Sequence, residues 1–204
     1  MRARRRLTTK YFIGVDEAGR GPIAGPVAVG VVVIPITFSS DFFKGIYDSK
    51  ELSEREREYW VEKTDALSAK GDLHYAVGFA SSEEIDTQGI VPSVTEALAR
   101  ALSAVKARPS LSCMFLDGSL FGPTRYLHRK TSVRGDVFEP VIALASIVAK
   151  VNRDRLMTEL SLEHPGYGFE KHKGYGTKDH YQAIRDLGLC PEHRKSFIKL
   201  SLDS

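Results

Sequence analysis

The chain has 204 residues and a mass of 22.6 kDa, enough for one domain with a substantial core but too little for two large ones. Hydrophobic residues make up 42% and charged residues 27% of it, and no apolar run approaches the roughly 20 residues that a membrane helix needs. The net charge of +3 and the pI near 8.8 permit nucleic-acid binding without requiring it.

The N-terminus and the cysteines bear on the compartment. Residues 1–10 carry five positive charges and no acid. No apolar stretch of about 7 to 15 residues with a small-residue cleavage site follows them, so we expect no secretory signal and a cytoplasmic location. The two cysteines, Cys113 and Cys190, lack the paired spacing of zinc or redox sites, so we expect both to be reduced.

The first predicted element is a strand over residues 11–15, a run of aromatic and β-branched residues that ends at Asp16 and Glu17. Glycine, arginine and proline then mark a turn. Neighbouring side chains on a strand point to opposite faces, so both acids can serve one site only where the strand frays into a loop. Ligands of α/β proteins usually bind at that end of a strand.

Further strands are predicted at 27–34, 73–80 and 111–118. The first of these is almost entirely β-branched, which indicates a central strand buried on both faces. Residues 39–50, between the first two, are predicted to be a loop.

Two helices are predicted between these strands. A capping box of Ser53 and Glu56 starts the first, and Gly71 is placed to end it. The second has apolar positions at helical spacing from 94 to 105 and stops before Pro109.

A longer helix is predicted over 139–163, and its first half is apolar all round, which indicates that it is buried. Two short helices follow the break "HPGYG", one over 177–187 and one entered at Pro191. The alternation of strands and helices predicts an α/β domain. The sequence shows no internal repeat and no low-complexity linker.

Acidic residues end two of the predicted strands and precede the long helix. They are Asp16, Glu17, Asp117 and Asp136. Four carboxylates at one edge of a sheet repel one another, and such a cluster persists mainly when divalent cations neutralise it. Mg²⁺ prefers oxygen ligands, and two such ions about 4 Å apart suit hydrolysis of a phosphodiester. Taken singly, each acid is more often a turn residue or, like Asp154, part of an ion pair on a helix surface.

The chain resembles the type 2 ribonucleases H, that is, the bacterial ribonuclease HII family. The resemblance covers roughly residues 11–198 and rests on ordered motifs: "GVDEAGRGPIAGPV", "DSKELS", "EEID", "FLDG", "RGD", "ASIVAKVNRD" and "HKGYGT". It implies a ribonuclease H-like mixed β-sheet flanked by helices, with a small C-terminal helical extension. We therefore expect one domain over 1–204, with a catalytic core at about 11–163 and the extension at about 164–204.

The resemblance also implies an activity and its cofactor. The enzyme would hydrolyse the RNA strand of RNA-DNA hybrids and incise 5′ of single ribonucleotides in duplex DNA, leaving 3′-hydroxyl and 5′-phosphate ends. These tasks belong to DNA replication and repair. Two Mg²⁺ or Mn²⁺ ions would be held by the four acids already named, and Asp154 matches a family position outside that quartet.

Substrate contacts are implied at five positions. The loop residues Gly19, Arg20 and Gly21 would read the ribonucleotide through main-chain groups, Tyr175 would stack on the sugar after the cleaved bond, and Lys50 would lie near the phosphates. Without the resemblance, Tyr175 is more often a plain loop aromatic and Lys50 a solvated side chain. Similarly, Lys150 and Arg153 are expected in structural pairs rather than in pairs with the site acids.

Basic residues gather near the C-terminus with four of the six histidines. They are Lys171, Lys173, Lys178, Arg185, Arg194, Lys195 and Lys199. The segment fits a duplex-binding surface, and charge alone equally fits a solvated basic surface. We expect a monomer that binds RNA-DNA hybrids and ribonucleotide-containing DNA and does not bind a membrane. The sequence does not decide whether a sliding clamp is a partner.

The sequence departs from the family pattern at two places. Many relatives carry Asn after the "EID" motif where this chain has Gly89, so one polar contact to DNA is missing or replaced by Gln88. The usual "SAAS" reads "ALAS", which places Ala143 and Leu144 in the long helix.

Three other functions remain open from the sequence. A type 3 ribonuclease H would cut hybrids but handle single ribonucleotides poorly, a hybrid-binding module would have no activity, and a DNA junction resolvase would cut branched DNA. The Gly19-Arg20-Gly21 loop and Tyr175 stand against the type 3 alternative.

Overall fold

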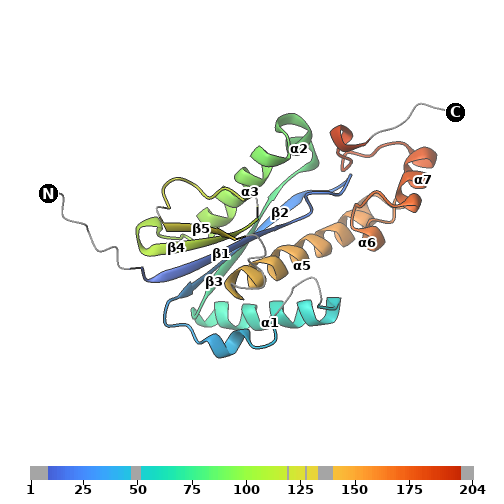
Figure 1. Ribbon diagram of the computed structural model, residues 1–204. Helices are drawn as coiled ribbons and strands as arrows, with labels where there is room; N and C mark the ends of the chain where they lie inside the picture. Colours follow the sequence, from blue (N-terminus) through green and yellow to red (C-terminus); the bar gives the residue numbers. More distant parts are fainter. Residues whose placement is uncertain (1–8, 47–51, 119, 127, 133–139, 199–204) are drawn as a thin grey trace.

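A computed structural model describes residues 9–46, 52–118, 120–126, 128–132 and 140–198. A five-stranded mixed sheet runs through its centre in the order β3-β2-β1-β4-β5 (Figure 1). The strands are β1 Tyr11–Ala18, β2 Val27–Pro35, β3 His74–Ala80, β4 Ser112–Asp117 and β5 His128–Ser132. The pairs β1-β2 and β2-β3 are antiparallel, whereas β1-β4 and β4-β5 are parallel. The predicted mixed sheet is confirmed.

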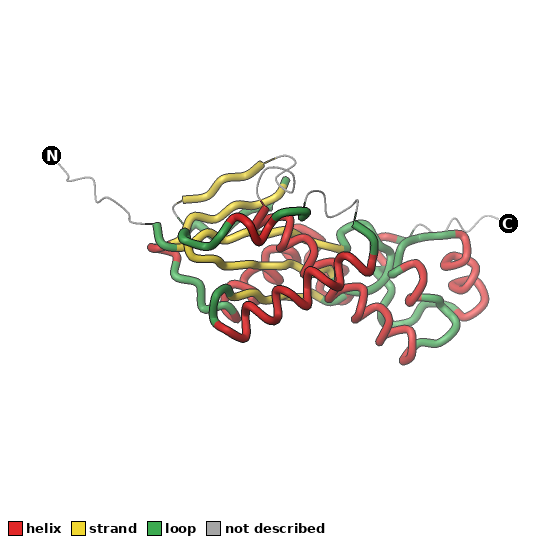
Figure 2. Tube along the Cα trace, turned by 90° about the horizontal axis from the view of Figure 1, so that it is seen from below, coloured by secondary structure: helices red, strands yellow, loops and turns green. Residues whose placement is uncertain are grey.

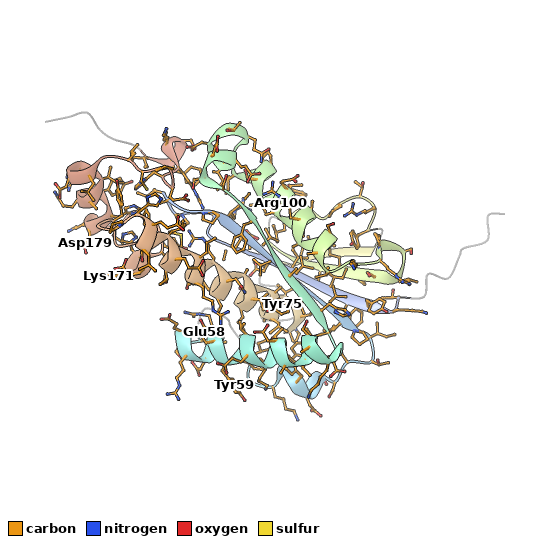
Figure 3. All side chains as sticks on the ribbon, turned by 180° about the vertical axis from the view of Figure 1, so that it is seen from behind. Glu58, Tyr59, Tyr75, Arg100, Lys171 and Asp179 are labelled. Atoms are coloured by element: carbon orange, nitrogen blue, oxygen red, sulfur yellow. The ribbon has the colours of Figure 1, made fainter. Side chains whose placement is uncertain are left out.

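Helices cover both faces of this sheet (Figure 1). They are α1 Glu54–Lys70, α2 Ser82–Gln88, α3 Ile90–Ala104, α5 Pro140–Glu163, α6 Phe169–His172 and α7 Lys178–Leu187, with short 3-10 turns η1 Ser40–Phe43, η2 Pro109–Leu111 and η3 Lys195–Phe197. Alternation along β1 sends Ile13 and Val15 into a core shared with α3, and Phe12 into a core shared with α5. The buried helix α5 packs on β1 and β2 and also against α1. Arg155 of α5 forms an ion pair with Glu58 of α1, which is labelled in Figure 3.

The predicted helix ends are confirmed where capping chemistry fixes them. The Ser53 hydroxyl accepts from the Glu56 amide, the Glu56 carboxylate accepts from the Ser53 amide, and Gly71 closes α1 with a φ of +79°. The predicted helix at Pro191 is wrong, because the chain there forms a turn and then η3. Three regular elements were not predicted: α2, β5 and the four-residue α6. The predicted loop at 39–50 contains η1 in its described part.

Glycines let α5 approach the sheet closely. A Cβ on Gly30 would stand 2.2 Å from the carbonyl oxygen of Ala145, and one on Gly14 would stand 2.2 Å from that of Val141. Both obstacles are helix backbone, which cannot rotate away. The packing of β1 and β2 on α5 therefore requires these two glycines.

We predict that Gly30→Ala costs about 3 kcal/mol or more of unfolding free energy, because α5 must shift as a whole to admit the methyl group. Urea denaturation followed by circular dichroism measures the loss. The control Ala66→Ser, on the exposed side of α1, should stay within about 0.5 kcal/mol of the parent. A Gly30→Ala cost as small as the control's would show that α5 does not pack as described.

The C-terminal segment extends beyond the end of the sheet (Figure 2). It has its own apolar cluster, in which Phe169 is fully buried and stacks on Tyr167 with ring centroids 5.5 Å apart. Ile23 and Ala24, from the segment between β1 and β2, belong to the same cluster. The extension therefore packs directly on the loop that follows Ala18, the last residue of β1. Within the described residues, no helix is both long enough and apolar enough to cross a membrane.

Candidate active site

Two carboxylates meet at the ends of parallel strands. Val15 of β1 pairs with Leu116 of β4, so the next residue on each strand, Asp16 and Asp117, lie beside each other on the face covered by α5. Asp16 is 7% exposed, while Asp117 is partly exposed. The structure therefore brings these two predicted site residues together.

Burial makes the Asp16 carboxylate costly. Loss of solvent is the largest cause that raises its pKa, the negative charges of Glu17 and Asp117 add to it, and a hydrogen bond from Ser146 of α5 acts in the opposite direction; together they raise the pKa of Asp16 to about 7. The Asp16 carboxylate also accepts from the Glu17 amide at 2.8 Å. A buried carboxylate beside two other acids is a place where a cation would be stabilised.

Glu17 is held differently. Arg20 donates to its Oε1 at 3.2 Å, whereas its buried Oε2 has no hydrogen-bond partner within the described part of the chain. Burial raises the pKa of Glu17, and the charge of Asp117 adds to this, although Arg20 acts in the opposite direction. An orphaned carboxylate oxygen is an unusual cost that a bound cation would remove.

The expected fraying of the strand at Asp16 is wrong. β1 continues to Ala18, and Asp16 and Glu17 pair in regular register with Gly30 and Val29 of β2. The Cα–Cβ bonds of the two acids therefore point to opposite faces of the strand. The charge of Asp117 nevertheless raises the pKa of both carboxyls, so they share one electrostatic site.

The donor chemistry fits a divalent cation. Asp16, Glu17 and Asp117 offer only oxygen ligands, and both the Asp16 side chain and the Oε2 atom of Glu17 are buried. The described residues alone contain no group of three or more histidine, cysteine, aspartate or glutamate side chains that would hold a metal. Two predicted site residues, Asp136 and Lys50, lie outside the described residues.

The loop after β1 lies between these acids and Tyr175. Gly19 has a φ of +87°, and a Cβ there would meet Nε of Arg153 at 1.9 Å, so only glycine fits. Gly21 is exposed, and a Cβ on it would be 4.0 Å from Cε1 of Tyr175. Glu17, Gly19 and Tyr175 line one cavity together with Ser146 and other residues of α5. Three of the predicted site residues, Glu17, Gly19 and Tyr175, thus face a common space.

Some basic residues are engaged elsewhere, as expected. Lys150 pairs with Asp154 at 2.7 Å one turn along α5, and Arg153 donates to main-chain carbonyls. The prediction of a basic C-terminal surface is wrong for Arg194, which is fully buried. At the outer end of the extension, the exposed side chains of Lys171 and Asp179 carry opposite charges, so this surface is not uniformly basic (Figure 3).

Buried histidines support the Tyr175 loop. The carbonyl of Tyr175 accepts from Nδ1 of His180 at 2.9 Å, which fixes the proton on that nitrogen. Nε2 of His180 must then accept from Nε2 of His193 at 3.1 Å, and Nδ1 of His193 accepts from the Cys190 amide at 2.9 Å. Both rings are therefore neutral in the folded protein, since an added proton would set two N–H groups against each other.

We predict that His180→Asn costs more stability at pH 7.5 than at pH 4.5. Burial lowers the pKa of His180 from 6.5 to about 4, so the folded parent loses stability as the pH falls from 6.5 to about 4, while asparagine does not titrate. The cost of the substitution should shrink by about 2 kcal/mol over this range. Urea denaturation of both proteins at the two pH values measures it, and an equal cost at both would contradict neutral, buried His180.

One residue beside the site acids, Ser146, was missed from the sequence. Ser146, which bonds Asp16, lies in the "ASIVAK" motif but looks like a small core residue of a buried helix. The structure accommodates both departures from the family pattern. Ala143 and Leu144 are fully buried in the core. Gly89 links α2 to α3, and the neighbouring Gln88 donates a hydrogen bond to Ser93 at 3.3 Å.

Comparison with known proteins gives matches over most of the chain. The family model described as Ribonuclease HII matches residues 13–202. The ribonuclease HII of Chlamydia trachomatis serovar D is 43% identical over 184 residues, which are 90% of this chain and 80% of the relative.

Solved structures share the fold. The Archaeoglobus fulgidus ribonuclease HII, determined as a complex with PCNA, superposes with a TM-score of 0.72 at 23% identity, covering 95% of this chain and 97% of that one. Bst-RNase HIII in complex with Mn²⁺ superposes with a TM-score of 0.60 at 20% identity, covering 90% of this chain but 64% of that one. The ribonuclease H-like fold is therefore shared with both types.

Proposed function

The chain belongs to the ribonuclease HII family, and from this membership we propose that it incises duplex DNA on the 5′ side of single embedded ribonucleotides. It is a ribonuclease H, an endonuclease that hydrolyses phosphodiester bonds. We propose that it also cuts the RNA strand of hybrids, leaving 3′-hydroxyl and 5′-phosphate ends. One observation carries the proposal: the buried carboxylate of Asp16 lies beside Asp117 on the neighbouring strand, and the adjacent Glu17 lines one cavity with Gly19 and Tyr175.

Divalent cations are the proposed cofactor, as Mg²⁺ or Mn²⁺. Asp16, Glu17 and Asp117, with Asp136, would hold two such ions, and this assignment is supported by Oε2 of Glu17, which has no hydrogen-bond partner among the described residues. When bound, the ions would supply an activated water and stabilise the leaving 3′ oxygen. No histidine is assigned as general base, because the described histidines near the site are committed to main-chain groups and to one another.

The protein's own residues would select and hold the substrate. Main-chain groups of the Gly19-Arg20-Gly21 loop are proposed to read the ribose 2′-hydroxyl, which both donates and accepts hydrogen bonds. Tyr175, about half exposed and facing Gly21, would stack on the next sugar. Ser146 would keep the Asp16 carboxylate in its rotamer, and Lys50 would contact the phosphates.

The remaining proposals concern organisation. We propose that residues 11–163 form the catalytic core and 164–204 an extension of one domain, and that the protein acts as a monomer in the cytoplasm, on cellular DNA.

The test is cleavage of three end-labelled duplexes with Mg²⁺ or with EDTA: DNA carrying one ribonucleotide, an RNA-DNA hybrid, and DNA alone. We expect a metal-dependent nick 5′ of the single ribonucleotide, cleavage of the hybrid, and intact DNA. Cleavage of the hybrid alone would indicate type 3 specificity and remove the proposed role of Tyr175. Absence of any cleavage would contradict the proposal, and cutting of branched DNA would favour a resolvase.

A further inference from the structure

A buried guanidinium gathers the carbonyls of the loop after β1. Arg194 has no exposed surface and, among the described residues, forms no ion pair with a carboxylate. Its Nη2 donates to the carbonyl of Gly19 at 2.8 Å, and its Nη1 to those of Arg20 at 3.1 Å and Pro22 at 2.9 Å. Its Nε donates to the carbonyl of Gly25 at 2.8 Å. One side chain thus fixes four peptide groups of the segment 19–25.

Burying the charged Arg194 side chain costs free energy, so the hydrogen bonds that offset this cost constrain the loop. A buried cation is stable only where hydrogen bonds replace its lost water, and burial, aided by the nearby charge of Arg153, lowers the pKa of Arg194 to about 9. Main-chain carbonyls rather than an acid supply the compensation. The carbonyls of Gly19, Arg20 and Pro22 must therefore stay turned toward Arg194, because each one that turned away would leave a buried donor unsatisfied.

The peptide geometry fixes what the loop presents on its other side. In a trans peptide, the N–H of the following residue points opposite to the carbonyl, and the described residues contain no cis peptide bond. With the carbonyls of Gly19 and Arg20 turned toward Arg194, the N–H groups of Arg20 and Gly21 are directed away from it. Gly21 is exposed there, next to Tyr175.

We propose that Arg194 is a positioning residue for sugar specificity. It orients two successive peptide planes so that the N–H groups of Arg20 and Gly21 donate to an acceptor oxygen on the substrate, the 2′ oxygen of the ribose. The proposal rests on the proposed function, in which this loop reads the ribonucleotide. In this proposal Arg194 acts through the loop, because its fully buried side chain does not itself contact the substrate.

A second buried arginine provides a matched control. Arg153 is 1% exposed and also donates to main-chain carbonyls, those of Pro26 at 2.9 Å, Lys173 at 2.9 Å and Ala24 at 3.3 Å. These carbonyls lie beyond Gly21, so loss of Arg153 leaves the peptide planes at Gly19 and Arg20 bonded to Arg194. The two arginines share chemistry and burial but hold different peptide groups.

The test compares kcat/KM on a duplex with one ribonucleotide and on the same duplex with a 2′-fluoro sugar, a poor acceptor, at that position. We expect Arg194→Lys to lower the ratio of the two values by about tenfold, because the oriented hydrogen bonds aid only the ribose. In Arg153→Lys both values should fall together and leave the ratio within about twofold. A folding defect reduces the active fraction for both substrates and cannot change the ratio. An unchanged ratio in Arg194→Lys would overturn the proposal.

A measurement on the parent protein needs no variant. With ¹⁵N-labelled protein and EDTA, we expect the amide protons of Arg20 and Gly21 to shift downfield with the ribonucleotide duplex and not with the all-DNA duplex. Binding of both duplexes without that difference would overturn the role of Arg194. If the parent failed to cleave the ribonucleotide duplex with Mg²⁺ at all, the proposed function would fail instead, which separates the two results.

Discussion

Asp16→Asn is expected to abolish cleavage and, at the same time, to stabilise the metal-free protein. The substitution removes a buried carboxylate whose pKa is raised to about 7 and keeps the shape of the side chain. Activity should fall by about a thousandfold or more, since a proposed metal ligand is lost. At pH 8 the free energy of unfolding should rise by roughly 2 to 4 kcal/mol, the cost of holding that charge in a buried position.

The sign of this effect depends on pH. Because the pKa of Asp16 is higher in the folded than in the unfolded protein, stability of the parent falls as the pH rises from about 4 to about 7. The gain from asparagine should therefore be largest above pH 7 and vanish near pH 4. Urea denaturation in EDTA at pH 4.5 and 8 measures it, with Asp179→Asn as an exposed control. If Asp16→Asn lowered the free energy of unfolding at pH 8, the Asp16 carboxylate could not be a buried charge that destabilises the metal-free protein.

Tyr175→Ala is expected to lower the rate of cleavage at a single ribonucleotide by about ten- to a hundredfold, the range for loss of one aromatic stacking contact. The backbone of the loop should stay in place, because the Tyr175 carbonyl remains bonded to His180 and to the Thr177 amide. Single-turnover cleavage with Mg²⁺ measures the rate.

Tyr175→Phe, which keeps the ring, is the matched control and should cleave nearly as fast as the parent. Cleavage by the alanine variant within about twofold of the parent would rule out stacking. Cleavage by the phenylalanine variant as slow as that of the alanine variant would assign the role to the hydroxyl instead of the ring.

Much of the fold follows from local patterns in the sequence. The capping box at Ser53, the β-branched run of β2 and the apolar first half of α5 each predicted an element that the structure contains. β5 was missed because its sequence, "HRKTS", is polar, so its place in the sheet comes from pairing with β4. The extent of β1 was also missed, since pairing with β2 holds two acids in a regular strand.

The acidic residues of the candidate site were predictable from the sequence, whereas the buried residues that hold its loops in place were not. Asp16 and Asp117 follow apolar strand runs, and this pattern is visible in the sequence. Arg194 looked like one more positive charge in a basic segment, yet it is buried among carbonyls some 170 positions earlier in the chain. His180 and His193 were equally hidden, because only the fold shows that their rings hydrogen-bond each other.

The measurement that tests the account most directly is calorimetric titration of Mn²⁺ into the parent protein, Asp16→Asn, Asp117→Asn and the control Asp179→Asn at pH 8. The account predicts binding to the parent and to the control, and at least about tenfold weaker binding to the two site variants. Unchanged binding in both Asp16→Asn and Asp117→Asn would place the metal elsewhere and contradict the assignment of the site.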